Sequence, residues 1–97
     1  MKKITIGIKE PGRAWHFREV EDALPTYQKI VGGYIQLGHA REDGILIFCN
    51  EEGKLHGLEP NIQLPYDVIV GTVFTVRSDE EGEFQGLTGE DIAVLSE

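Results

Sequence analysis

The stretch from Ile45 to Asn61 constrains the fold most, because it joins an apolar run to two chain reversals. Ile45–Phe48 is a continuous apolar run rich in β-branched and aromatic residues, which is typical of a strand buried on both faces. Asn50–Gly53 then predicts a type I turn with its glycine in the left-handed region. After that turn, Lys54 and Leu55 are expected to resume an extended chain.

The end of this stretch predicts a corner. Proline cannot donate to a β-ladder, so Pro60 is expected to stop the extended segment, with Asn61 just past it. The asparagine side chain can then bond nearby backbone or point into a site. Ile62–Tyr66 is expected to be irregular because it contains Pro65.

Alternating apolar and polar residues predict further strands around this centre. The first two are joined by Glu10-Pro-Gly-Arg13, a type II turn pattern, and Asp43-Gly44 signals another hairpin. A last short strand is expected near Phe84 and Leu87, after an acidic turn at Ser78–Glu83. The expected alternating strands are Lys2–Lys9, Ala14–Val20, Tyr34–Ala40 and Asp67–Arg77.

Two helices are predicted. Leu24–Val31 carries Pro25 in its first turn, Asp22 stands before it as a candidate N-cap, and Gly32 follows it in the position that ends helices. Thr88-Gly-Glu-Asp91 resembles a capping box and opens a short C-terminal helix. The chain is therefore expected to form one α+β domain over residues 1–97. Its mainly antiparallel sheet of five or six strands would carry one packed helix and a short C-terminal helix.

Charge and composition exclude several classes of function. The net charge is −8, from 17 acidic and 9 basic residues, so the chain lacks the basic surface that general nucleic-acid binding needs. No apolar run is long enough to span a membrane, and the N-terminus has no signal-peptide pattern. One cysteine, Cys49, excludes an internal disulfide framework and fits a cytoplasmic location.

Catalytic and metal signatures are also missing from the sequence. The three histidines are scattered, no phosphate-binding glycine loop opens a helix, and no nucleophile elbow is present. Cys49 lies in the apolar run and is expected to be an inert core thiol. We therefore expect no metal, no cofactor and no enzymatic activity.

A small-ligand site is the remaining hypothesis. Tyr34, Asn50 and Asn61 each stand at a chain reversal, where scaffolds display functional groups. They are expected to converge with Arg18 or Arg77 on one cleft. The tyrosine would stack on a flat ring, the amides would read its edge, and the guanidinium would meet an anionic group. A second copy of the chain could complete the cleft as a homo-oligomer. In the alternative interpretation, Tyr34 is a core residue and each asparagine only forms a turn.

Nearly the whole chain resembles a family of small proteins known only as a domain of unknown function, found in Gram-positive bacteria, their phages and their conjugative elements. The residues that carry the resemblance are Ile30–Ile35, Asn50–Leu55, Gly57-Leu58, Pro60-Asn61, Asp67–Thr72 and Gly86–Thr88. The resemblance implies a single-domain cytoplasmic accessory protein of mobile elements, with no assigned catalytic residue.

Three functions follow as hypotheses. The first is a non-enzymatic protein that sequesters a small ligand, such as a nucleotide immune signal, against host defence. The second is an acidic protein that binds a host protein, for example as a DNA mimic. The third is an enzyme that processes small nucleotides.

Overall fold

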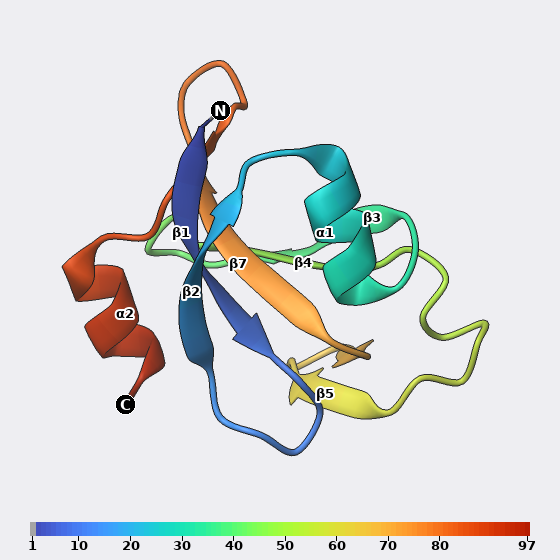
Figure 1. The fold of residues 1–97 in the computed structure, drawn as a ribbon. Coiled ribbons are helices and arrows are strands. Elements are labelled where there is room, and N and C mark those ends of the chain that lie inside the picture. The colour runs from blue at the N-terminus through green and yellow to red at the C-terminus, as the bar shows by residue number, and fades with distance from the viewer. Residues whose placement is uncertain (1) are drawn as a thin grey trace.

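Six strands form the main sheet, in the order β2-β1-β7-β4-β3, with β8 paired to β7 (Figure 1). A separate two-stranded sheet consists of β5 and β6. The structure is a computed structural model and describes residues 2–97. The elements are β1 (Lys3–Lys9), β2 (His16–Glu21), α1 (Leu24–Val31), β3 (Ile35–Ala40), β4 (Leu46–Asn50), β5 (Pro60–Gln63), β6 (Val68–Val70), β7 (Val73–Ser78), β8 (Phe84–Gln85) and α2 (Gly89–Leu95).

The fold class predicted from the sequence is confirmed. The strand pairs of the main sheet are antiparallel, α1 packs on one face, and α2 is a short C-terminal helix. The predicted turn before β2 is present, since the N–H of Arg13 donates to the carbonyl of Glu10 and Gly12 has φ 76°. The hairpin between β3 and β4 is also present, with Gly44 at φ 93°.

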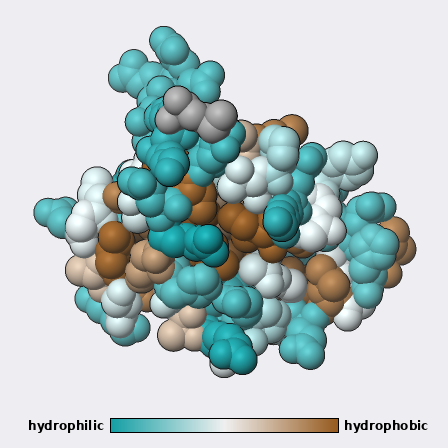
Figure 2. Space-filling model, viewed as in Figure 1, coloured by the Kyte–Doolittle hydropathy of each residue, from teal (hydrophilic) through white to brown (hydrophobic). Residues whose placement is uncertain are grey.

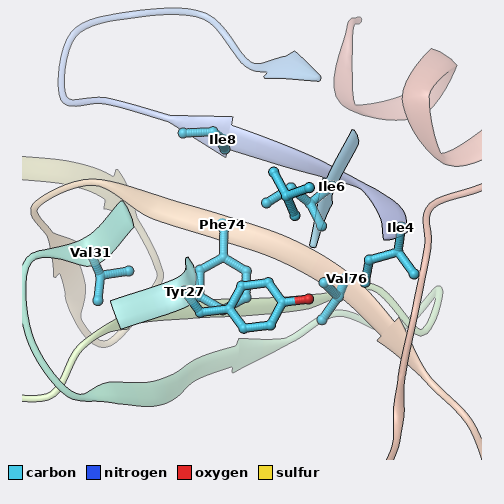
Figure 3. Packing of buried hydrophobic residues seen from close by; sticks show 8 residues of the cluster. Ile4, Ile6, Ile8, Tyr27, Val31, Phe74 and Val76 are labelled. Atoms are coloured by element: carbon cyan, nitrogen blue, oxygen red, sulfur yellow. The ribbon is translucent and has the colours of Figure 1, made fainter. Parts of the chain in front are cut away.

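The face of the sheet under α1 holds the larger core (Figure 3). Tyr27 of α1 stacks on Phe74 of β7 with ring centroids 4.7 Å apart, and its hydroxyl donates to Asp22 at 2.6 Å. Offset-stacked aromatic pairs are favourable beyond the area that they bury. These contacts fix α1 across the middle of the sheet. The buried members of this core are Ile4, Ile6, Ile8, Val20, Tyr27, Val31, Phe74 and Val76.

Two elements cover the opposite face. At one end, Leu95 of α2 packs with Ile45 and Leu87. At the other end, Ile69 of β6 packs with residues of β4 and β7. Trp15 contacts both clusters and so connects the two halves of this face.

The helix ends follow the sequence signals with one exception. Gly32 ends α1 in the left-handed region at φ 82°, as predicted. Thr88 and Asp91 form the predicted capping box of α2. The prediction that Asp22 caps α1 is wrong, because Ala23 occupies the N-cap position and no side chain caps the helix. Asp22 is instead engaged by the hydroxyl of Tyr27.

The predicted strand Asp67–Arg77 is in fact two strands in different sheets. Gly71 separates them at φ 78°, and its N–H donates to the carbonyl of Glu59 at 2.7 Å. A period-two pattern continues across such a bend, so alternation alone does not show where a strand changes sheet. The first piece, β6, turns away to pair with β5. The expectation that Ile62–Tyr66 is irregular is wrong for Ile62 and Gln63, which belong to β5, and is confirmed for Leu64–Tyr66.

The chain after β4 differs from the prediction as well. Residues 51–57 form a continuous series of turns, and the left-handed residue is Gly57, at φ 67°, instead of Gly53. Gly53 is buried, and a Cβ there would lie 2.9 Å from the side chain of Val70. Close packing therefore explains this glycine. Lys54 and Leu55 belong to the turns and do not resume an extended chain.

Among the described helices, neither is long and apolar enough to cross a membrane.

Candidate functional site

The structure does not bring Tyr34, Asn50 and Asn61 together with Arg18 or Arg77 in one cleft. Tyr34 and Asn50 lie at one end of the sheet, since Asn50 ends β4 opposite Ile35. Asn61 lies near Lys9, which pairs with the first residue of β7. Arg77 lies towards the other end of β7, where it pairs with β8.

The side-chain amide of Asn50 is hydrogen-bonded to backbone groups. Its Nδ2 donates to the carbonyl of Val31 at 3.2 Å, and its Oδ1 accepts the N–H of Glu52 at 2.8 Å. The amide therefore joins the C-terminal end of α1 to the turn after β4. This matches the turn-forming interpretation of Asn50.

The side-chain amide of Asn61 makes more hydrogen bonds than that of Asn50. Its Nδ2 donates to the carbonyls of Lys9 and Gly71, both at 2.8 Å, and its Oδ1 accepts the Nζ of Lys9 at 2.6 Å. Both donors of this amide are used. Asn61 therefore ties β5 to the ends of β1 and β6.

Arg77 holds α2 to the sheet. Its Nε and Nη2 donate to the two carboxylate oxygens of Asp91, each at 2.7 Å, in a bidentate pair. The carboxylate is 4% exposed and also accepts the N–H of Thr88. The Arg77 hydrogen bonds lower the pKa of Asp91 to about 2, with the Thr88 bonds adding to the effect. Asp91 in turn raises the pKa of Arg77. The prediction that Arg77 converges on a cleft with the asparagines is not supported.

Tyr34 is 66% exposed, so it is not the core residue that the alternative interpretation expected. Its carbonyl accepts the N–H of Glu51 at 2.8 Å. Tyr34 lines neither the groove beside Arg18 nor the cavity beside Cys49, which are described below. It is available for a contact but is not enclosed in a site.

Arg18 lies on a groove between β2 and α1 that we name the basic groove. It has a volume of about 370 Å³ and is lined by Arg18, Val20, Thr26, Lys29 and Ile30. Arg18 and Val20 share one face of β2 because they are two residues apart, and the three helix residues share one face of α1. Two cations and a hydroxyl thus surround an apolar floor.

The two cations of the basic groove are free. Among the described residues, neither Arg18 nor Lys29 makes a side-chain hydrogen bond or ion pair, and no lining residue is acidic. Arg41, Lys54 and Arg77, by contrast, each bind a carboxylate. The sequence reasoning named Arg18 but missed Lys29. The sequence shows that Lys29 and Thr26 are spaced to share one face of a helix, but it does not show that β2 lies beside α1.

A second cavity of about 350 Å³ lies among β3, the turns after β4, and β6; we name it the β3–β6 cavity. Cys49 lines it and is half-buried, not a fully buried core residue as expected. Burial raises the pKa of the Cys49 thiol, which favours the unreactive protonated form. Lys54 and Asp67 form an ion pair at this cavity. The remaining lining residues are Gln36, Leu37, Gly38, Asn50, Glu51, Glu52, Gly53, Leu55, Val68, Ile69 and Val70.

Acidic side chains are displayed elsewhere on ordered turns. The turn Asp79–Glu83 extends past the sheet at the top of Figure 1, and the surface there is hydrophilic in Figure 2. The carboxylate of Asp79 accepts the N–H groups of Glu81 and Glu83, both at 2.9 Å, and these bonds lower its pKa. Within residues 2–97, no group of three or more His, Cys, Asp or Glu side chains is placed to hold a metal ion.

These features define a small α+β domain with a mainly antiparallel sheet and two open cavities of different charge. Residues 4–97 match the family described as a domain of unknown function, DUF3846, and the chain belongs to that family. This agrees with the resemblance to a domain of unknown function. No curated protein and no solved structure matches the chain.

Proposed function

We propose that this protein is a non-enzymatic accessory protein of a phage or mobile element that sequesters a small anionic ligand in the basic groove. The supporting observation is the pairing of two free cations, Arg18 and Lys29, without any carboxylate in the lining. In a chain of net charge −8, such a site stands out from the surrounding acidic surface.

The groove offers complementary contacts to a nucleotide immune signal. A guanidinium can bind a phosphate with two parallel hydrogen bonds, and an ammonium adds a second charge. Val20 and Ile30 provide an apolar floor on which a base can lie, and the hydroxyl of Thr26 can bond a sugar or phosphate oxygen. Ligand sites commonly combine an apolar surface with a few convergent polar groups in this way.

Binding without catalysis fits this lining, because it contains no carboxylate, histidine or cysteine beside Lys29 or Thr26 to activate either of them as a base or nucleophile. A bound ligand would be held and shielded but not transformed. Capture of this kind lowers the free concentration of a signal in proportion to the amount of protein made.

Titration calorimetry against a panel of cyclic and linear nucleotides tests this function. Arg18→Gln and Lys29→Gln should each weaken binding, because a hydrogen bond to a charged group contributes about 1.5–3 kcal/mol. That loss corresponds to about tenfold to hundredfold in Kd. Arg13→Gln is the matched control, since Arg13 is exposed on the turn before β2 and outside the groove.

The result that contradicts the proposal is specific. If the wild type binds no nucleotide at micromolar concentration while retaining a host protein, the small-ligand function is wrong and the acidic protein-binding alternative replaces it. Equal weakening by Arg13→Gln and Arg18→Gln would show that net charge, and not the groove, governs binding.

A further inference from the structure

The end strand β3 is an open sheet edge without charge protection. Within the described residues, β3 pairs only with β4, and its sequence Ile-Gln-Leu-Gly-His-Ala contains no Asp, Glu, Lys or Arg. The end strand at the opposite edge, β2, carries Arg18, Glu19 and Glu21. Charged residues are a common means of preventing edge strands from pairing with other chains. Their absence leaves β3 as the edge that can accept another strand.

The geometry of β3 limits where a strand could add. The register with β4 shifts between Leu37 and His39, which makes Gly38 an extra residue and bends the second half of the strand. The first half, Ile35–Leu37, keeps a regular register. A partner strand is therefore expected to pair along this half.

The β3–β6 cavity opens beside the same half of the strand. Gln36, Leu37 and Gly38 line it on one side, and Val68 and Ile69 of β6 line it on another. Leu37 is 47% exposed. When a peptide adds to a sheet edge, main-chain bonds provide affinity and pockets for alternate side chains provide specificity. Leu37, Val68 and Ile69 give this otherwise polar cavity an apolar wall against which one such side chain can pack.

The charge around the cavity favours a basic partner. Glu51 and Glu52 line it and are exposed, while its one cation, Lys54, is bound to Asp67. The N–H of Glu51 bonds the carbonyl of Tyr34, which places these acids at the start of β3. A strand that carries Lys or Arg would gain attraction here. A second copy of this chain, at net charge −8, would be repelled.

We propose that β3 binds an extended, basic segment of a partner protein. The segment adds as a strand along Ile35–Leu37, places one apolar side chain in the β3–β6 cavity, and sets its cations against Glu51 and Glu52. This surface is separate from the basic groove, so the two sites can be tested independently.

Fluorescence anisotropy with labelled peptides tests the proposal. The probe is a short peptide that alternates Lys with Leu. The first comparison peptide has Glu in place of each Lys, and the second has an N-methyl group on every backbone nitrogen, because methylation of alternate nitrogens would block only one of a strand's two edges. The protein should bind the alternating Lys-Leu peptide, and it should bind neither comparison peptide. The N-methylated peptide keeps the charge and apolar side chains but cannot complete the ladder.

Protein variants locate the site. The double variant Glu51→Lys, Glu52→Lys should weaken binding of the basic peptide by about tenfold or more, because two attractive charges become repulsive. Glu80→Lys with Glu81→Lys is the matched control, since it changes net charge equally on the distant acidic turn. Leu37→Glu should also weaken binding of the basic peptide, even though it adds a negative charge, because it removes an apolar side chain from the wall of the cavity. Circular dichroism of each variant confirms that the fold is kept.

Several outcomes would overturn the proposal. Equal losses in the two charge-reversed pairs would show that only net charge matters. Equal binding of the N-methylated peptide would exclude strand addition. A dimer that persists at the concentrations of the titration and is broken by Leu37→Glu would show that a second copy occupies the edge. No binding of the basic peptide at all would also overturn it.

Discussion

Removing the charge of Asp91 should destabilise the fold strongly, even though this residue lies near the C-terminus. The substitution Asp91→Asn keeps the size of the side chain but replaces one carboxylate oxygen with an N–H₂ group. That group then faces the donors of Arg77, which now bind the carboxylate at 2.7 Å. The change therefore removes the ion pair and places the N–H₂ group of the asparagine against the N–H donors of Arg77.

The magnitude follows from the pKa of the carboxyl group. Folding lowers the pKa of Asp91 from 3.8 to about 2. Each unit of difference between the folded and unfolded states corresponds to about 1.4 kcal/mol, so the charged form contributes about 2 kcal/mol to the free energy of unfolding. Because the folded pKa is the lower one, this contribution is fully present above the unfolded value. It is lost as the pH falls through about 2.

Urea unfolding of the wild type and Asp91→Asn measures the difference directly. At pH 7 the variant should be less stable by about 2 kcal/mol, and the gap should shrink as the pH is lowered from 4 towards 2. Glu90→Gln, on the same turn of α2 but exposed, is the control and should cost about 0.3–1 kcal/mol at most. Equal stability of wild type and Asp91→Asn at pH 7 would refute this reasoning. A gap that stays constant down to pH 2 would show that packing, and not charge, is responsible.

Three further outcomes are expected. Asn61→Ala should lower the free energy of unfolding by about 1–3 kcal/mol, because it leaves two part-buried backbone carbonyls without a donor; urea unfolding with unchanged stability would contradict this. Gly32→Val should cost about 1–2 kcal/mol from left-handed strain, and Gly33→Val should also destabilise, since its Cβ would lie 2.9 Å from Asn50. Unchanged melting midpoints for both valine variants would exclude that explanation. Cys49 should react slowly with dithionitrobenzoate at neutral pH, because its raised pKa keeps the thiol protonated; rapid stoichiometric labelling would show an activated nucleophile.

The helix α1, which has a sequence signal at each end, was predicted to the residue, whereas β1, β2 and β3 were predicted to within one or two residues. The bounds of α1 were predicted correctly because Pro25 suits a first helical turn and Gly32 can adopt the left-handed conformation. The hairpins at Gly12 and Gly44 followed from the same kind of signal. In contrast, the division of Asp67–Arg77 depends on the contact of Gly71 with Glu59 and Leu58, which lie on another segment.

The candidate site was harder to predict because polar residues at chain reversals have two uses. The sequence correctly marked Asn50 and Asn61 as unusual, but the side chains satisfy backbone groups left open where strands end. Buried backbone donors and acceptors must be paired, and asparagine can do both. Whether an amide serves the backbone or a ligand depends on neighbours that are distant in sequence, such as Lys9 for Asn61.

A domain of this size has little interior to spare for a binding site. Among the described residues, the buried polar side chains are Thr75 and Asp91. Asp91 and the half-buried Asn61 connect α2 and β5 to the main sheet. Groups free to bind a ligand therefore remain at the margins of the sheet, beside the two end strands. One margin carries free cations on the groove between β2 and α1, and the other carries carboxylates next to the uncharged edge of β3. We therefore propose that opposite charge at the two edges lets the anionic ligand and the basic partner bind without competition between them.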